Sequence, residues 1–158
     1  MNYYGNVNPD LLARIPITAK RVLEVGCGSA RLGEAFKARS PNSEYYGIEM
    51  FVSAANDAAK VIDGVICANI ELDTTAALKL SPSFDSLIFG DVLEHLKDPW
   101  QVLSDLRQFI EPGGSWIACI PNVAHWSIVS GLLQGNWDYQ DSGLLDRTHL
   151  RFFTLDSI

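Results

Sequence analysis

The chain has 158 residues, of which 47% are hydrophobic, and its formal net charge is -7 at pH 7. This length and composition suit one globular domain and leave no room for a second. The acidic balance argues against a nucleic-acid partner, because binding nucleic acid needs clustered Lys and Arg to neutralise phosphates. A small-molecule partner is therefore expected.

Neither a membrane span nor an export signal is predicted. No window approaches the ~18 continuous apolar residues of a transmembrane helix, and residues 1–12 lack the basic and then apolar order of a signal peptide. We therefore expect a soluble, cytoplasmic protein. Cys27, Cys67 and Cys119 lie in separate apolar segments without the spacing of a zinc site, so neither a metal site nor a disulfide is predicted.

Short apolar runs alternate with segments of helical periodicity, a pattern that is typical of βα units in a parallel sheet. We expect strands at 21–25, 45–49, 64–68, 84–89 and 115–120, and helices at 30–38, 52–61, 74–80 and 100–110. The helix at 100–110 is expected to stop at Pro112-Gly113-Gly114, a turn that leads into the fifth strand.

The alternation ends after Pro121. Residues 123–133 predict a helix, and residues 135–149 are polar, aromatic and irregular. Such a long irregular stretch is uncommon in a compact domain unless it forms a lid or a binding loop. Residues 123–149 are therefore a candidate substrate lid, with a purely structural excursion as the alternative. Thr154 could cap a further helix, which the chain is too short to complete.

Three aromatic residues of the candidate lid also have two interpretations. Trp126, Trp137 and Tyr139 could line an acceptor pocket, because aromatic rings line most small-ligand sites. They could equally belong to the core.

A glycine-rich turn is predicted where the first strand leads into the first helix, in the sequence Glu24-Val25-Gly26-Cys27-Gly28. Glycines there let the backbone approach a ligand, and the following helix N-terminus offers unpaired amides. Two glycines also occur in many tight turns for conformational reasons alone. Glu49 favours the ligand interpretation, because it closes the second strand, where a carboxylate can accept hydrogen bonds from both hydroxyls of a ribose.

A nucleoside without a pyrophosphate fits this turn best. The dinucleotide fingerprint GxGxxG would need glycine at position 31, where the chain has Arg31. Glu24 beside the loop would repel a pyrophosphate but would suit an ammonium or sulfonium group. S-adenosylmethionine carries both cations and no phosphate, so it is the predicted cofactor.

On these residues the chain resembles the class I S-adenosylmethionine-dependent methyltransferases, and the resemblance covers nearly all of it. The matching motifs read VLEVGCGSARLG, YYGIEM, ANIE and FDSLIFGDVLEHLKDP. The last motif is the most specific and resembles the quinone and small-molecule O-methyltransferase branch. The stretch PNVAHWSIVSGLLQGNWDYQDSGLLDRTHLRFFT is similar to bacterial methyltransferases that accompany glycosyltransferases in polysaccharide pathways.

The resemblance implies an α/β fold with a Rossmann-like, doubly wound, mainly parallel sheet in the strand order 3-2-1-4-5. Complete domains of the family add two strands that form an antiparallel hairpin, and no segment of this sequence corresponds to them. We therefore expect a single methyltransferase domain over residues 1–158, truncated at its C-terminus. A sheet that ends at the fifth strand exposes an edge that favours pairing, so a homodimer is also expected.

The motifs place cofactor contacts at eleven positions. These are Glu24, Gly26, Cys27, Gly28, Glu49, Met50, Asn69, Ile70, Gly90, Asp91 and Val92. Asn69 departs from the aspartate that the family usually has there, although an amide could still accept a hydrogen bond from the adenine amino group. Glu94 and His95 would open towards the substrate.

Methyl transfer is a direct displacement at carbon, so it depends on positioning, and a general base matters only for a hydroxyl acceptor. His95 is the first candidate base, because it follows the fourth strand and because histidine is the side chain whose unperturbed pKa, near ~6.5, suits proton removal at neutral pH. It could equally pack the loop that ends at Pro99. His149 and Asp146 are further catalytic candidates, although Asp146 and Arg147 could instead form a structural ion pair.

The leading hypothesis is an O-methyltransferase that acts on a sugar, a lipid-linked saccharide or another small hydroxylated molecule. One alternative is a non-catalytic cofactor-binding or scaffold module. Another is an NAD-dependent oxidoreductase, which the departure from the dinucleotide fingerprint makes weaker.

Overall fold

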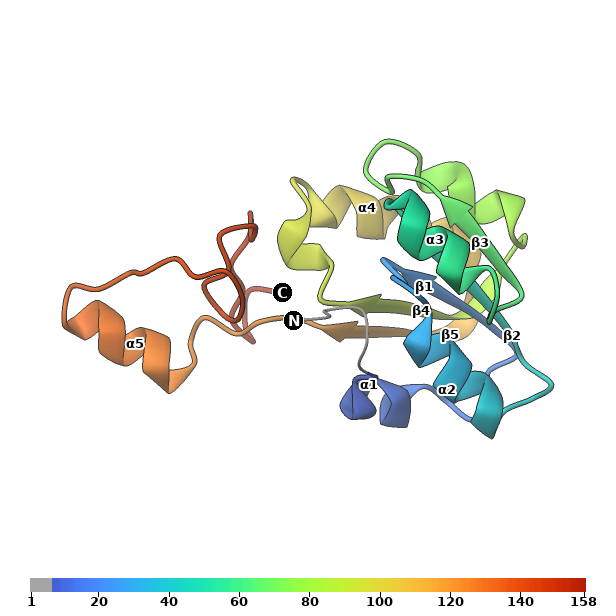
Figure 1. Cartoon of the computed structure of the whole chain (residues 1–158), viewed down its shortest axis with the longest axis horizontal. Coiled ribbons are helices and arrows are strands. Elements are labelled where there is room, and N and C mark those ends of the chain that lie inside the picture. The colour runs from blue at the N-terminus through green and yellow to red at the C-terminus, as the bar shows by residue number, and fades with distance from the viewer. Residues whose placement is uncertain (1–6) are drawn as a thin grey trace.

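The computed structural model of the chain contains one sheet of five parallel strands in the order β3-β2-β1-β4-β5 (Figure 1). It describes residues 7–158. Residues 1–6, on which the prediction about a signal peptide partly rests, lie outside the described residues. The parallel pairing and the strand order confirm the predicted Rossmann-like fold class.

The first four strands lie close to the predicted places, whereas the fifth, predicted at 115–120, already begins at Ile110. The strands are β1 (Arg21–Val25), β2 (Glu44–Glu49), β3 (Gly64–Cys67), β4 (Phe84–Gly90) and β5 (Ile110–Cys119). The α-helices are α1 (Pro9–Arg14), α2 (Arg31–Arg39), α3 (Val52–Ala58), α4 (Pro99–Leu106) and α5 (Trp126–Leu133). The part of the chain that the structure describes also contains the 3₁₀ helices η2 (Thr74–Lys79), η3 (Leu93–His95) and η4 (Arg107–Phe109).

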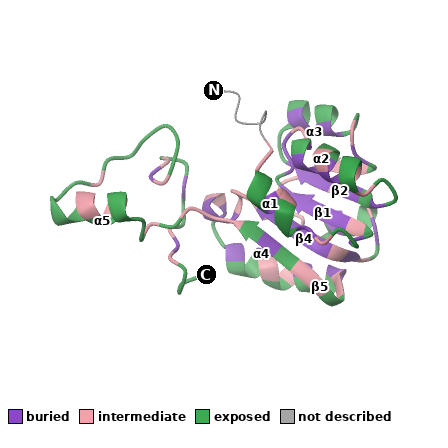
Figure 2. Cartoon of the chain, turned by 90° about the horizontal axis from the view of Figure 1, so that it is seen from below, coloured by how far each residue is buried: buried purple, intermediate pink, exposed green. Residues whose placement is uncertain are grey.

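Both faces of the sheet are buried, and successive side chains of a strand point to opposite faces. On one face, Leu87 and Phe89 of β4 belong to a core that includes residues of η2 and α4. On the other face, Ile88 belongs to a core that includes residues of α1 and α2. Figure 2 shows this burial concentrated along the strands. The continuous apolar runs that predicted the strands are explained by this two-sided covering.

The start of β5 and the presence of α1 differ from the prediction for local reasons. The Pro112-Gly113-Gly114 turn expected before the fifth strand lies inside β5, where the pairing register with β4 shifts between Phe84 and Ser86. A proline is tolerated in β5 because this strand is at the edge of the sheet. Helix α1 was not expected, although Asn8 caps it by accepting hydrogen bonds from the backbone amides of Asp10 and Leu11, and Pro9 begins it.

The segment after β5 lies beside the sheet domain rather than over it (Figure 1). Helix α5 begins at Trp126, with His125 as its N-cap, and it has no buried residue. Trp126 is 74% exposed and Tyr139 is 53% exposed, so neither belongs to the core. The segment returns to the domain near its end, where the Leu150 amide donates to the Glu94 carbonyl oxygen of η3 at 2.7 Å.

Thr154 begins a turn, not a helix, since the Ser157 amide donates to its carbonyl oxygen at 3.2 Å. Within residues 7–158, no helix has both the length and the apolar character that crossing a membrane requires.

Candidate functional site

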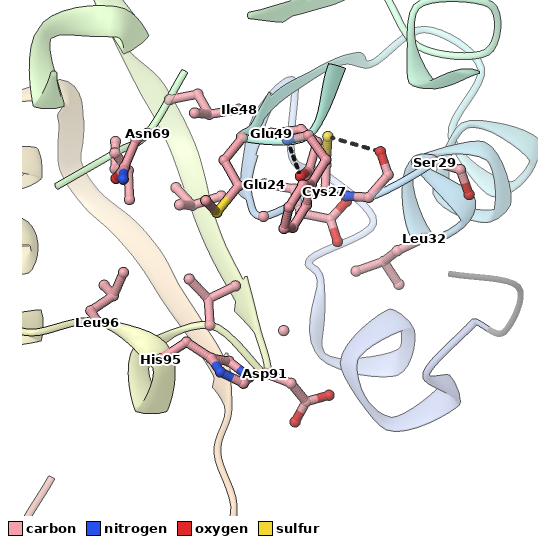
Figure 3. A pocket seen from close by; sticks show the side chains of 18 of the residues that line it. Glu24, Cys27, Ser29, Leu32, Ile48, Glu49, Asn69, Asp91, His95 and Leu96 are labelled. Carbon is pink, nitrogen blue, oxygen red and sulfur yellow. Dashed lines mark hydrogen bonds between the residues drawn. The ribbon is translucent and has the colours of Figure 1, made fainter. Parts of the chain in front are cut away.

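A pocket of about 560 Å³ opens at the carboxyl ends of β1, β2 and β4 (Figure 3). The strand order reverses between β1 and β4, and ligands of doubly wound sheets bind at such a point. All eleven predicted cofactor positions line this pocket: Glu24, Gly26, Cys27, Gly28, Glu49, Met50, Asn69, Ile70, Gly90, Asp91 and Val92. The structure therefore brings together residues that the sequence distributes over four motifs.

The turn after β1 depends on its glycines. Gly26 and Gly28 have φ angles of 70° and 53°, in the left-handed region that side chains disfavour. A Cβ atom on Gly26 would lie 2.4 Å from Cγ2 of Val92, which is a steric clash. The Gly26 amide donates to the Ile48 carbonyl oxygen at 2.7 Å, which ties the turn to β2. The close approach of Gly26 to Val92 joins two of the predicted motifs.

Glu49 ends β2 and is fixed by backbone amides. Its Oε2 accepts a hydrogen bond from the Gly28 amide at 2.9 Å, and its Oε1 accepts one from the Phe51 amide at 2.8 Å. The side chain is 4% exposed. Each carboxylate oxygen has a second lone pair, so the oriented carboxylate can still accept hydrogen bonds from two hydroxyls.

Glu24 is also buried, and it carries less charge than the sequence argument assumed. Burial raises the pKa of Glu24 to about 8, although the Tyr45 hydroxyl donates to its Oε2 at 2.9 Å. At neutral pH the side chain is therefore mainly protonated when no ligand is bound. A cation in the pocket would favour the carboxylate form again.

The remaining predicted contacts lie around the same space. Burial raises the pKa of the Cys27 thiol, so this cysteine stays protonated and is not a nucleophile. Asn69 turns the chain after β3, because its Oδ1 accepts a hydrogen bond from the Glu71 amide at 2.9 Å. Asp91 has a φ of 53° and follows β4, and in Figure 3 it lies with His95 on the wall opposite Glu49.

Of the three catalytic candidates, His95 and Asp146 line the pocket and His149 does not. The Nδ1 of His95 lies 3.2 Å from the Thr148 carbonyl oxygen, and its ring contacts that of His149 with centroids 4.9 Å apart. The two histidines, distant in sequence, thus form a pair at the edge of the pocket.

Asp146 has a local structural role. Its Oδ1 accepts hydrogen bonds from the Thr148 amide at 2.8 Å and from the Thr148 hydroxyl at 2.7 Å. The alternative of an ion pair between Asp146 and Arg147 is wrong, because Arg147 pairs with Asp141 at 2.9 Å. Of the candidate lid, Asp146 and Thr148 line the pocket.

Sequence reasoning missed several residues at the site. Asn8 and Leu11 line the pocket from α1, and the Asn-Pro-Asp capping signal could have revealed this helix. Glu94, expected to open towards the substrate, is 1% exposed and is buried beside the pocket. Trp126, Trp137 and Tyr139 are not among the described residues that line the pocket.

Comparison with known proteins assigns the fold and the pocket to a family. A profile described as a methyltransferase domain matches residues 23–116, which is more than half of the chain. The chain therefore belongs to this methyltransferase family.

Curated relatives are longer than this chain. The trans-aconitate 2-methyltransferase of Methylobacterium nodulans is 31% identical over 114 residues, which cover 72% of this chain and 43% of that protein. The ubiquinone biosynthesis O-methyltransferase of Paraburkholderia phymatum is 32% identical over 108 residues, which cover 64% of this chain and 44% of that protein. The chain thus spans less than half the length of these relatives.

Solved structures share the fold. The plantazolicin methyltransferase BpumL in complex with SAH matches with a TM-score of 0.68 and 22% identity, over 89% of this chain and 52% of that one. A SAM-dependent methyltransferase from Archaeoglobus fulgidus matches with a TM-score of 0.65 and 18% identity, over 88% of this chain and 57% of that one. SAH, S-adenosylhomocysteine, is the demethylated product of S-adenosylmethionine, so the cofactor predicted from the sequence agrees with these findings.

Proposed function

We propose that this chain binds S-adenosylmethionine in the 560 Å³ pocket and belongs to an enzyme that methylates an oxygen of a small acceptor. The main support is the hydrogen bond that the Gly28 amide donates to Glu49 Oε2 at 2.9 Å. It joins the glycine turn of β1 to the acidic end of β2, and this pairing suits the ribose of a nucleoside. Membership of the methyltransferase family argues against the NAD-dependent alternative.

The proposed roles of the pocket residues are to bind the cofactor and to position it for the reaction. Glu49 would accept hydrogen bonds from the ribose hydroxyls, Glu24 would face the cationic amino-acid part, and Asn69 and Ile70 would contact the adenine. The chemistry is a displacement in which the acceptor attacks the methyl carbon and the sulfonium leaves as a neutral thioether. Positioning alone accounts for up to ~7–11 kcal/mol of such a barrier in favourable cases.

A hydroxyl acceptor is supported by the name of the ubiquinone biosynthesis relative, which is an O-methyltransferase. A sugar or lipid-linked saccharide as the acceptor rests on the sequence resemblance of the C-terminal stretch. Homodimer formation through the edge strand β5 likewise stays a prediction.

Thermal unfolding with added ligands tests the cofactor. A ligand at 100 times its Kd stabilises the native state by ~2.7 kcal/mol, which for a chain of this size raises Tm by roughly 5–10 °C. We expect this rise with SAH and none with NAD at equal concentration. A rise with NAD alone would favour an oxidoreductase.

Turnover needs a separate test, because the chain spans less than half of the curated relatives' length. Transfer of labelled methyl groups to hydroxylated acceptors is the expected result. SAH binding without transfer to any acceptor in a broad screen would favour the non-catalytic binding module.

A further inference from the structure

Three side chains beside the pocket form a group that the proposed cofactor contacts do not use. Glu94 and His95 of η3 and His149 of the C-terminal segment each offer one ligand atom, and these atoms all lie within 4.8 Å of one another. Cysteine spacing predicted no metal site, and it could not have revealed this group, which has no cysteine and joins two distant segments.

Glu94 is the member of the group whose environment most needs an explanation. It is 1% exposed, and within residues 7–158 neither of its carboxylate oxygens has a hydrogen-bond partner. A buried carboxylate without a partner is strongly unfavourable, so it must take up either a proton or a cation. Burial accordingly raises the pKa of Glu94 to about 7.

Each imidazole ring has a nitrogen that is available to an ion. The buried Nδ1 of His149 has no hydrogen-bond partner among the described residues. The Nδ1 of His95 faces the Thr148 carbonyl oxygen at 3.2 Å, and a proton there leaves the lone pair of Nε2 available. Histidines that bind metals are oriented by partners of this kind.

Backbone hydrogen bonds hold the C-terminal segment against η3 without a bound ion. The Glu94 carbonyl oxygen accepts hydrogen bonds from the Leu150 amide at 2.7 Å and from the Arg151 amide at 3.0 Å. The guanidinium of Arg151 also donates to the Lys97 carbonyl oxygen. His149 is therefore tied to η3 through its own chain neighbours.

We propose that Glu94, His95 and His149 bind one first-row transition-metal dication, of which Zn²⁺ is the representative. Two imidazoles and one carboxylate are donors of catalytic zinc sites, in which three protein ligands leave a further position open. Ligand atoms about 2.0–2.2 Å from a tetrahedral ion lie roughly 3.4 Å apart. In the structure the three ligand atoms lie within 4.8 Å of one another, so binding an ion requires them to approach each other by little more than about one ångström.

The ion would lie at the pocket wall, because His95 lines the pocket. Its role in catalysis rests on the proposed function. An acceptor hydroxyl in the open position would lose its proton to water more readily. The resulting oxygen would form a bond to the methyl carbon as the carbon–sulfur bond breaks and its electron pair returns to sulfur. The substrate class is thus an acceptor whose hydroxyl can bind a metal.

The test is titration of the metal-free chain with Zn²⁺ by calorimetry. We expect one Zn²⁺ per chain, and an affinity on the order of 100-fold weaker for Glu94→Gln and for His149→Ala. His125→Ala is the matched control, because His125 is the exposed N-cap of α5 and lies outside the group, so the affinity of this variant should equal that of the wild type. Co²⁺ in place of Zn²⁺ should give visible bands without a thiolate charge-transfer band, which excludes the cysteines.

Thermal unfolding separates metal binding from misfolding. Glu94→Gln removes a buried carboxylate, so it should keep or raise the Tm of the metal-free chain while losing the rise that Zn²⁺ gives the wild type. Absence of saturable Zn²⁺ binding, or equal affinity in Glu94→Gln, His149→Ala and the wild type, would overturn the proposal. SAH titrations of the same proteins report on the proposed function independently, because these variants leave Glu49 and the glycine turn intact.

Discussion

Substitution of Glu49 tests the proposed ribose contact. Glu49→Ala should weaken SAH binding by ~1.5–3 kcal/mol, which is the range for hydrogen bonds to a charged group. Calorimetry measures this loss. Glu44→Ala is the control, because Glu44 begins the same strand but is exposed. Equal affinities of the Glu49→Ala variant and the wild type would remove Glu49 from the site.

Glu24 makes stability depend on pH. Its pKa is 4.5 in a model peptide and about 8 in the folded chain, so folding takes up a proton between these values. The free energy of unfolding should therefore fall as pH rises from about 4.5 to about 8, by up to ~1.4 kcal/mol per pH unit. Urea unfolding of the wild type and Glu24→Gln measures this slope. Glu24→Gln should show a shallower fall, and an identical slope in both proteins would contradict the assignment.

The residues of the glycine turn and of the acidic strand ends could be predicted because each has a local signal. Gly26, Gly28 and Glu49 stand at fixed offsets from predicted strands, so their approach follows from parallel-sheet geometry. The pairing of His95 with His149 had no such signal, because it depends on how the segment after β5 returns to η3. The burial of Glu94 likewise follows from tertiary packing alone.

The contribution of the turn between β1 and α2 to cofactor binding can be tested by substituting Gly26. Gly26→Ala should reduce SAH affinity at least about 10-fold, since a Cβ atom would meet Val92 at 2.4 Å and the φ of 70° is strained. Gly113→Ala has a similar φ of 82° but nothing within 4 Å of the new Cβ atom. It should cost about 1–2 kcal/mol of stability and leave SAH affinity unchanged. Similar SAH affinity in both variants would show that crowding at Gly26 is unimportant.

The strands were predicted well because parallel strands covered on both faces are rich in apolar residues, as the run Leu87-Ile88-Phe89 of β4 is. Helical ends were less predictable. The expected helix at 74–80 is the 3₁₀ helix η2, and the helix expected from 123 begins only at Trp126. Intrinsic propensity is weak over so few residues, and capping decides the ends.

The distribution of buried residues over the molecule predicts which elements unfold locally first. The strands β1 and β4 hold fully buried residues such as Leu23 and Leu87, whereas α5 has none. Hydrogen exchange should therefore be slowest in β1 and β4 and fast in α5. Protection of α5 equal to that of β4 would contradict this order of opening.

The path of residues 123–149 was the least predictable feature of the fold. Composition identified an irregular segment but could not place it, because few of its residues are buried and its contacts with the domain, such as that of Thr148 with His95, join residues far apart in the sequence. Its role as a lid stays a prediction.

A structure with bound SAH is the decisive experiment for the proposed cofactor site. We predict the adenosyl group on the turn of Gly26 and Gly28, both ribose hydroxyls donating to Glu49, and the sulfur towards Asp91 and His95. Density for SAH at another place on the chain, with this pocket empty at saturating concentration, would contradict it.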